Sequence, residues 1–173
     1  MVNVIITGCM GRMGKRLVAL SNFDKEVEIV GAIEAPKHTF LGKDIGEALG
    51  LGILDVKISD KFDKALKKAD VIIEFTNPAA TINHLDIARH AKKGMVIGTT
   101  GLKSDDIEKI NECVKKIPIV FSPNMSLGIN LLFELIGECA KRLGKDYDTE
   151  IIEAHHKFKK DAPSGTAKAF AEI

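Results

Sequence analysis

Residues 2–14 read VNVIITGCMGRMG, an unbroken apolar run followed directly by regularly spaced glycines. The run at 2–7 is rich in β-branched side chains, which is typical of a strand buried on both faces of a parallel sheet. Gly8, Gly11 and Gly14 follow where the strand would end and a helix would begin. There, glycine allows a tight turn, close approach of the backbone to a pyrophosphate, and close packing of helix on strand. The segment therefore predicts a dinucleotide-binding strand–turn–helix unit.

An acidic residue supports this interpretation. Glu34 ends a second apolar run at 27–33, 20 residues beyond Gly14, where a carboxylate could accept hydrogen bonds from ribose hydroxyls. The GxxGxxG spacing departs from the commoner GxGxxG, so a purely structural role for the glycines, with Glu34 a solvated loop residue, stays open. Ala35 comes next, and no arginine is adjacent to bind a 2′-phosphate, which a carboxylate would also repel. We expect NADH to be used at least as well as NADPH.

Strand-length apolar runs alternate with helical patterns along most of the chain. This alternation predicts an α/β fold with a doubly wound, Rossmann-like parallel sheet. A glycine-rich stretch at 38–60 interrupts it, and we expect a loop there with one short helix at 44–49. The expected strands are 2–7, 27–33, 71–75, 95–99 and 117–121, and the expected helices are 11–21, 61–68, 78–93 and 104–116.

The pattern changes after residue 121. A turn precedes a long apolar helix at 127–143, followed by a predicted strand at 148–156 and a helix opening at Ser164. We therefore predict a dinucleotide-binding domain at 1–126 and the start of a smaller α+β substrate domain at 127–173.

Composition excludes several classes of protein. The 173 residues carry a formal net charge of +1, which argues against a surface that wraps nucleic acid, because such binding needs a clustered basic excess. The three cysteines lie at scattered spacings typical of reduced, mostly buried thiols. The first apolar run is too short for a signal peptide or a membrane span. We expect a cytoplasmic protein without membrane or nucleic-acid partners.

Three further segments follow strands of the expected sheet, at 75–77, 98–101 and 122–125. They carry small or hydroxyl side chains that would let the backbone approach a nicotinamide ribose or carboxamide. Each alone could be a simple strand-ending turn. Ligands of open α/β sheets bind beyond the carboxyl ends of the strands, so the three together favour a cofactor cleft.

Residues 153–166, EAHHKFKKDAPSGT, are the segment richest in reactive side chains. His155 and His156 are adjacent and would point to opposite faces of a strand, which is poor geometry for two ligands of one metal ion. We predict no metal site. A histidine is suited to proton transfer near neutral pH, and Glu153 would share a strand face with His155 and could orient it.

The end of this segment has the pattern of a helix start. Ser164 is a candidate cap, and the free backbone N–H groups of a first turn can hold a carboxylate or phosphate. Lys159 could add a positive charge to the same anion. The alternative is a capped surface helix with solvated lysines.

These motifs together resemble the dihydrodipicolinate reductase family. The resemblance is carried by residues 8–14, 98–101, 122–126 and above all 153–166, and it extends over essentially the whole chain. It implies NAD(P)H-dependent reduction of 4-hydroxy-tetrahydrodipicolinate to tetrahydrodipicolinate, in diaminopimelate and lysine biosynthesis. The rivals are another dehydrogenase built on the same cofactor domain and a catalytically silent dinucleotide-binding module.

The resemblance also implies roles for individual residues. His155 would be the proton donor and acceptor and Lys159 a second proton donor, while the dicarboxylate substrate would be bound by His156, Gly165 and Thr166. NADH or NADPH would be contacted by Gly8, Cys9, Met10, Gly11, Arg12, Met13, Glu34, Gly98, Thr99, Thr100, Ser122, Pro123, Asn124 and Met125.

Two departures from the family pattern bear on these roles. Family members that accept NADPH readily usually carry arginine where this chain has Ala35. Family enzymes also run on for several tens of residues beyond the position of Ile173 and assemble as homotetramers. We therefore expect residues 127–173 to represent only part of a substrate domain.

Overall fold

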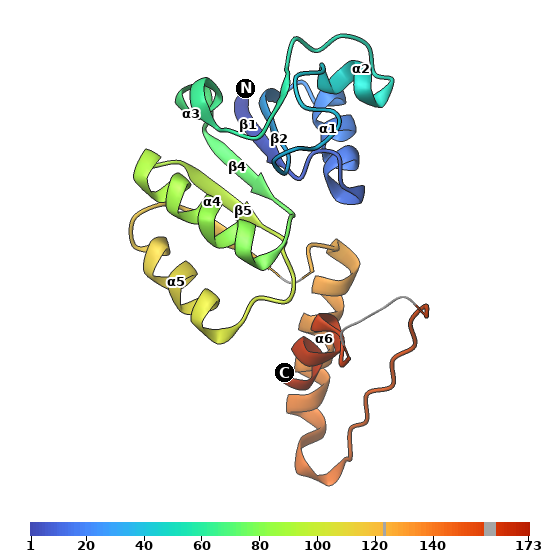
Figure 1. The fold of residues 1–173 in the computed structure, drawn as a ribbon. Coiled ribbons are helices and arrows are strands. Elements are labelled where there is room, and N and C mark those ends of the chain that lie inside the picture. Colours follow the sequence, from blue (N-terminus) through green and yellow to red (C-terminus); the bar gives the residue numbers. More distant parts are fainter. Residues whose placement is uncertain (123, 158–161) are drawn as a thin grey trace. The chain divides into compact units, whose positions relative to one another are not determined.

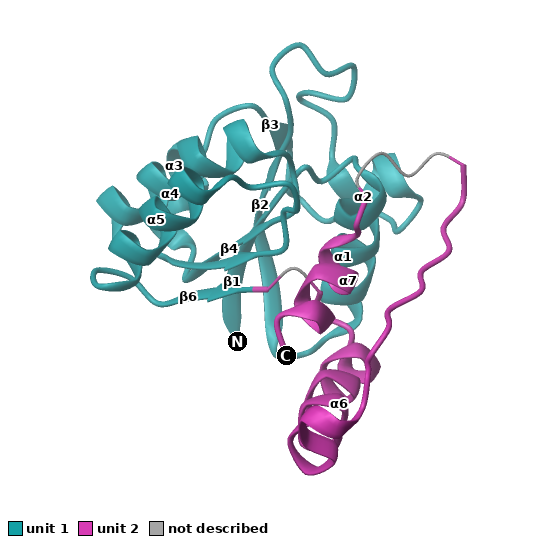
Figure 2. Ribbon diagram, turned by 90° about the horizontal axis from the view of Figure 1, so that it is seen from below, with its two compact units in different colours: residues 1–121 teal, residues 122–173 magenta. Residues whose placement is uncertain are grey.

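The computed structural model describes residues 1–122, 124–157 and 162–173. The chain divides into two compact units, Met1–Phe121 and Ser122–Ile173 (Figure 2). This division falls at the end of the last strand, ahead of the domain boundary predicted after residue 126, which stays a prediction.

The first unit is built on a six-stranded sheet in which every neighbouring pair of strands is parallel (Figure 1). The α/β, Rossmann-like prediction is therefore confirmed. The order β3-β2-β1-β4-β5-β6 reverses direction at β1 and β4, which makes their carboxyl ends the expected ligand crevice. The strands are β1 (Val2–Thr7), β2 (Val27–Ile33), β3 (Ile58–Ser59), β4 (Val71–Glu74), β5 (Gly94–Ile97) and β6 (Ile119–Phe121).

Helices cover both faces of this sheet. Figure 2 shows α3, α4 and α5 on one side and α1 and α2 on the other. Ile5 of β1 packs in the core with Leu85 and Ile110, whereas its neighbours Val4 and Ile6 belong to the core on the opposite face. Burial on both faces explains why the strands have unbroken apolar sequences. The helices are α1 (Arg12–Phe23), α2 (Ile45–Leu49), α3 (Asp63–Lys68), α4 (Pro78–Ala91) and α5 (Ser104–Val114).

The glycine-rich stretch contains the short predicted helix, as α2, and also the strand β3, which the sequence analysis missed. The carboxylate of Asp44 caps α2 by accepting from the amides of Gly46 at 2.8 Å and Glu47 at 3.1 Å. It also accepts from the amides of Leu54 at 3.1 Å and Val56 at 3.0 Å. The Asp44 carboxylate thus holds the start of α2 against residues 54–56, which lie shortly before β3.

The second unit contains α6 (Leu127–Leu143), a 3₁₀ turn (Gly144–Asp146) and α7 (Gly165–Ala171). The rings of Phe133 and Phe170 pack edge to face between α6 and α7, with centroids 4.5 Å apart. The bounds predicted for α6 are confirmed. Ser164 caps α7 as predicted, because its hydroxyl accepts from the amide of Ala167 at 3.0 Å.

The strand predicted at 148–156 is wrong. These residues have no regular secondary structure, and no strand occurs among the described residues of the second unit. A strand needs a neighbour to pair its backbone N–H and C=O groups, and none of the described residues forms a strand beside this segment, so its β-branched composition is not enough.

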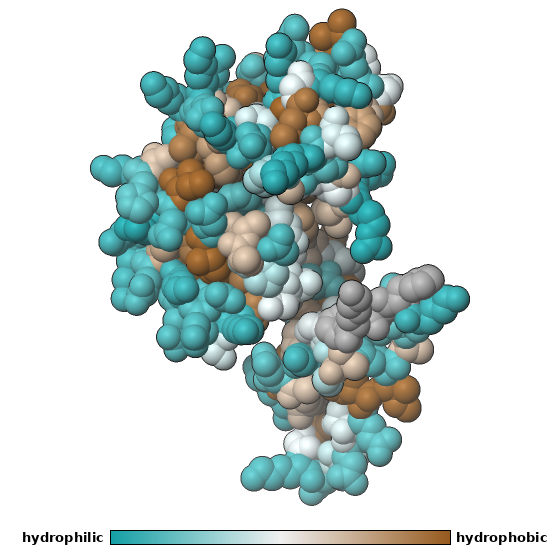
Figure 3. All heavy atoms as spheres, viewed as in Figure 1, coloured by the Kyte–Doolittle hydropathy of each residue, from teal (hydrophilic) through white to brown (hydrophobic). Residues whose placement is uncertain are grey.

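The visible surface of the first unit is mainly hydrophilic, with small apolar patches between charged side chains (Figure 3). No helix in the described parts of the chain is long and apolar enough to cross a membrane. Cys9 and Cys113 are buried and Cys139 is exposed, and all three are free thiols.

Candidate functional site

The glycine turn has the geometry that its sequence predicts. Gly8 has a φ of +60°, a left-handed conformation that favours glycine, and the amide of Gly11 donates to its carbonyl at 2.9 Å. A Cβ on Gly14 would overlap the Gly8 carbonyl oxygen and lie 2.7 Å from the Cα of Cys9. The packing role predicted for Gly14 is therefore confirmed. It brings the start of α1 directly against the end of β1.

Cys9 lies within this turn but faces the protein core. Its amide donates to the carbonyl of Ile33 at 3.1 Å, and its side chain is wholly buried. Burial, with a smaller contribution from the nearby charge of Glu34, raises the pKa of the thiol to about 12. The thiol is therefore protonated at neutral pH and is an unreactive part of the core.

Glu34 joins the end of β2 to the glycine turn. One carboxylate oxygen accepts from the amide of Met10 at 2.9 Å, and the other accepts from the amide of Ala35 at 2.8 Å. An ionised carboxylate has about four acceptor positions, so both oxygens can still accept from a ribose diol.

Glu34 lines a hollow of about 520 Å³ beyond the carboxyl ends of β1, β2 and β4. We call this the Glu34 hollow. Its size is within the usual range for a small-molecule site. It is lined by Gly8, Gly11, Ile33, Glu34, Ala35, Pro36, Asp60, Phe75, Thr76, Asn77, Ala80, Asn83 and His84.

A second hollow of about 650 Å³, the Arg12 hollow, shares Phe75 and Thr76 with the first. Arg12 and Arg16 lie one turn apart on α1 and both line it. Guanidinium groups beside the amides of a helix start suit a pyrophosphate. The lining residues are Arg12, Met13, Arg16, Phe75, Thr76, Gly98, Thr99 and Thr100.

The segment after β5 forms one wall of the Arg12 hollow. A Cβ on Gly98 would overlap the ring of Phe75, so glycine lets this aromatic ring lie against the backbone. Thr100 is exposed, whereas Thr99 is buried and its hydroxyl oxygen lies 2.8 Å from that of Thr81. The structure thus brings Arg12 and Met13, in the first turn of α1, and the segment 98–100 to one hollow. Their contacts with a cofactor stay predictions.

His84 lines the Glu34 hollow and contacts the buried Glu74, and the sequence analysis missed both. The Glu74 side chain is fully buried, and one of its oxygens lies 2.6 Å from Nδ1 of His84. Burial alone would raise the pKa of this carboxyl, but hydrogen bonds from His84, Thr76 and Thr7, with the charge of His84, hold that pKa below its usual value. The sequence contains one indication of Glu74, because this acidic residue ends the otherwise apolar run 71–74.

In the second unit, Asn124 contacts one of the predicted substrate-binding residues. Its side-chain amide donates to the hydroxyl of Thr166 at 3.0 Å, and its Oδ1 accepts from the amide of Ser126 at 2.9 Å. The hydroxyl of Ser122 donates to the carbonyl of Asn124 at 2.7 Å. Pro123 lies outside the described residues.

Glu153 contacts His155, as predicted, although not through a shared strand face. Nδ1 of His155 lies 3.4 Å from one oxygen of Glu153, and the other oxygen accepts from the amide of Ser164 at 2.9 Å. His155 and His156 are both exposed. Lys159 lies outside the described residues. Within those residues, no cluster of His, Cys, Asp and Glu side chains could hold a metal ion.

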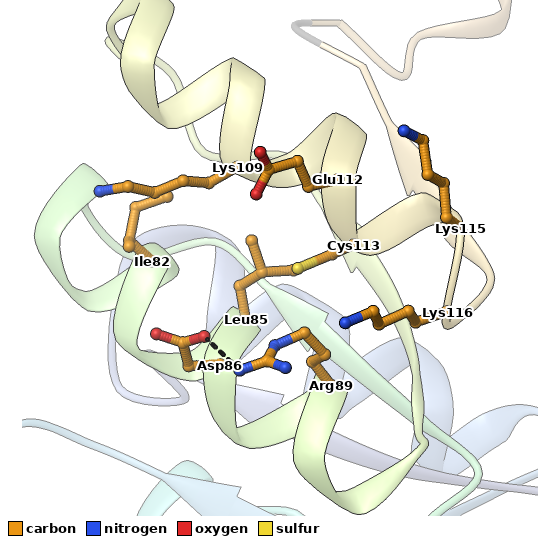
Figure 4. Close-up of a pocket in the computed structure, with 9 residues that line it drawn as sticks. All are labelled: Ile82, Leu85, Asp86, Arg89, Lys109, Glu112, Cys113, Lys115 and Lys116. Carbon is orange, nitrogen blue, oxygen red and sulfur yellow. Dashed lines mark hydrogen bonds and ion pairs between the residues drawn. The ribbon is translucent and has the colours of Figure 1, made fainter.

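Another hollow, of about 530 Å³, lies between α4 and α5 (Figure 4). The guanidinium of Arg89 pairs there with Asp86 at 3.3 Å, and Lys115 and Lys116 lie at the C-terminal end of α5. None of the predicted site residues lines it. Helices of a doubly wound sheet return toward the amino ends of the strands, so this hollow is away from the crevice where such sheets bind ligands.

Comparison with protein-family models gives two matches. The model "Dihydrodipicolinate reductase, N-terminus" matches residues 2–125, and "Dihydrodipicolinate reductase, C-terminus" matches residues 128–173.

Curated proteins and a solved structure agree with these matches. The 4-hydroxy-tetrahydrodipicolinate reductase of Aquifex aeolicus (strain VF5) is 48% identical over 175 residues, covering 99% of this chain and 66% of that protein. The enzyme of the same name from Citrifermentans bemidjiense is 40% identical over 173 residues, covering 100% of this chain and 65% of that protein. The dipicolinate-bound dihydrodipicolinate reductase from Paenisporosarcina sp. TG-14 superposes with a TM-score of 0.75 at 28% identity, covering 99% of this chain and 64% of that one. The chain thus spans just under two thirds of the length of these relatives.

Proposed function

This chain belongs to the dihydrodipicolinate reductase family, and on that premise we propose that it reduces 4-hydroxy-tetrahydrodipicolinate to tetrahydrodipicolinate with NAD(P)H. The observation that supports this most strongly is the pair of adjoining hollows beyond β1 and β4, one containing Glu34 and the other containing Arg12. Together they supply an acceptor for a ribose diol and cations for a pyrophosphate, spaced along one crevice.

The residues of the first unit fit a dinucleotide. Glu34 would accept from the adenosine ribose hydroxyls, and Arg12, Arg16 and the first amides of α1 would hold the pyrophosphate. Gly98 and Thr100 would approach the nicotinamide half from the far wall of the Arg12 hollow. The bound reduced nicotinamide supplies a hydride. Cofactor contacts from Ser122, Asn124 and Met125 stay predictions.

The residues of the second unit would transfer protons and bind the carboxylates of the substrate. Reduction removes the substrate's 4-hydroxyl as water and adds a hydride at C4, and the resulting enamine needs a proton. His155, held beside Glu153, would carry that proton, with Lys159 as a second donor. His156, Gly165 and Thr166 would bind the two carboxylates and orient the ring.

The test is NADH oxidation followed at 340 nm, coupled to enzymatic generation of the hydroxy-substrate, with a parallel titration of NADH binding. We expect binding and substrate-dependent turnover. Binding without turnover would favour a silent dinucleotide-binding module, and turnover only with a different substrate would favour another dehydrogenase. Absence of binding would contradict the dinucleotide site itself.

Two further expectations follow from family membership. We propose a homotetramer, which light scattering or sedimentation would test, and a cytoplasmic location, which fractionation of the source cells would test.

A further inference from the structure

The starting observation is a buried carboxylate directly behind the candidate cofactor crevice. Glu74 ends β4 at the point where the sheet order reverses, and its side chain has no exposed surface. The remainder of that strand is the apolar segment 71–73. An apolar side chain of similar volume would fill this position without the desolvation cost of a charge, so packing alone gives no reason for a carboxylate here.

The donors to this carboxylate come from several parts of the crevice. One oxygen accepts from the hydroxyl of Thr7 at 2.8 Å and lies 2.6 Å from Nδ1 of His84. The other accepts from the amide of Thr76 at 3.0 Å, from the hydroxyl of Thr76, and from the hydroxyl of Thr81 at 3.2 Å. Glu74 therefore connects the end of β1, the segment after β4, and α4.

The connections through the segment after β4 and through α4 reach walls of the crevice. His84 lines the Glu34 hollow, and Thr76 lines both hollows. Thr81 passes the connection to Thr99, which lines the Arg12 hollow, through a hydroxyl–hydroxyl bond of 2.8 Å. Glu74 itself lines neither hollow, so it acts on a ligand only through these neighbours.

We propose that Glu74 is the positioning residue of the dinucleotide crevice, holding His84 and Thr76 in their binding orientations through one buried carboxylate. This inference rests on the proposed binding of NAD(P)H. An ionised carboxylate only accepts hydrogen bonds, so Nδ1 of His84 must carry the hydrogen that it shares with Glu74. In a neutral ring, Nε2 is then left as an acceptor. The same reasoning directs the amide and hydroxyl hydrogens of Thr76 away from the ligand.

Glu74→Gln tests the proposal, because it keeps the shape of the side chain but replaces one acceptor with an NH₂ group that opposes the donors around it. We expect the NADH dissociation constant to rise about tenfold or more, since hydrogen bonds to charged groups contribute strongly. Glu28→Gln, on an exposed position of β2, is the matched control and should change the constant less than about twofold. Both are measured by fluorescence titration, with thermal unfolding recorded in parallel.

Two further readouts separate positioning from general stability. In a protein that already carries His84→Ala, Glu74→Gln should raise the NADH dissociation constant by a smaller factor than it does in the wild type. Nitrogen-15 NMR of the wild-type protein, at a pH where the ring is neutral, should show His84 with its hydrogen on Nδ1.

The outcomes are distinct. A folded Glu74→Gln variant with unchanged NADH affinity overturns the proposal, and so does a wild-type His84 carrying its hydrogen on Nε2. If Glu74→Gln does not fold, Thr76→Val is titrated instead, and unchanged affinity in that variant overturns the proposal equally. Failure of the wild type to bind NADH would refute the proposed function, and the NMR tautomer would still report on the Glu74–His84 bond.

Discussion

The amide of Ser164 donates a hydrogen bond of 2.9 Å to Glu153, and this contact ties the carboxylate to the first residue before α7. The second oxygen of Glu153 lies 3.4 Å from Nδ1 of His155. A carboxylate held from one side can orient an imidazole on the other, which is the arrangement a proton-transferring histidine needs.

His155→Ala is therefore expected to lower kcat by about 10²–10⁴, the range for loss of a general acid or base. Glu153→Gln should lower kcat less, because the amide keeps an acceptor for Ser164 but loses the charge beside His155. Steady-state kinetics in the coupled 340 nm assay measure both. Unchanged kcat in His155→Ala would remove this histidine from the mechanism.

Cofactor preference should follow from the surroundings of Glu34. The guanidinium groups of Arg12 and Arg16 line the neighbouring hollow, not the one that contains Glu34, and the residue after Glu34 is Ala35. A 2′-phosphate would then meet a carboxylate without an arginine partner. We expect kcat/KM for NADH to equal or exceed that for NADPH.

Ala35→Arg should shift that ratio toward NADPH by about tenfold, because a guanidinium would then lie next to the phosphate. Lys37→Arg is the matched control, because it introduces a guanidinium group at an exposed position two residues after Ala35. A wild-type ratio that strongly favours NADPH would contradict the role assigned to Ala35.

The elements predicted well from sequence are those with local signals. The first strand–turn–helix unit follows from a β-branched run and spaced glycines, and α4 starts at Pro78 after Asn77, whose side chain accepts from the amide of Ala80 at 3.1 Å. Caps and periodicity involve residues within one turn of each other, so a sequence reveals them directly.

The features that were missed depend on contacts between distant segments. Ile58–Ser59 becomes a strand only because β2 is available to pair with it. The segment 148–156 stays irregular because no strand in the described part of the chain lies beside it. Glu74 and His84 are ten residues apart in sequence and meet only when α4 packs back on the end of β4. Sequence reasoning found the glycine turn and Glu34 but not the buried carboxylate of Glu74 or the histidine that it contacts.

Gly14→Ala should destabilise the first unit by about 1–3 kcal/mol or more, because the new Cβ would overlap a backbone carbonyl that cannot move independently of β1. Gly128→Ala is the control. Its Cβ would meet nothing closer than 3.9 Å in the first turn of α6, so alanine should be neutral or stabilise by up to about 1 kcal/mol. Denaturant unfolding measures both, and equal stability of the two variants would contradict the packing role of Gly14.

Acid should unfold the first unit through Asp44 and Glu74. Burial opposes ionisation of each carboxyl, but amide donors around Asp44, and His84 with the threonine donors around Glu74, leave both pKa values below the ordinary range. A lowered pKa in the folded state contributes stability that is fully present above the unfolded value of about 4, and that is lost as pH falls through the folded value.

The free energy of unfolding should therefore decline below about pH 4. Asp44→Asn should flatten part of that decline and reduce stability at pH 7 by about 1–2 kcal/mol, because the amide cannot accept from all four backbone donors. Asp55→Asn, in the same excursion and exposed with a φ of 56° that asparagine tolerates, should leave both unchanged. Urea unfolding between pH 3 and 7 distinguishes them, and an identical acid profile for Asp44→Asn and wild type would show that this carboxylate does not contribute.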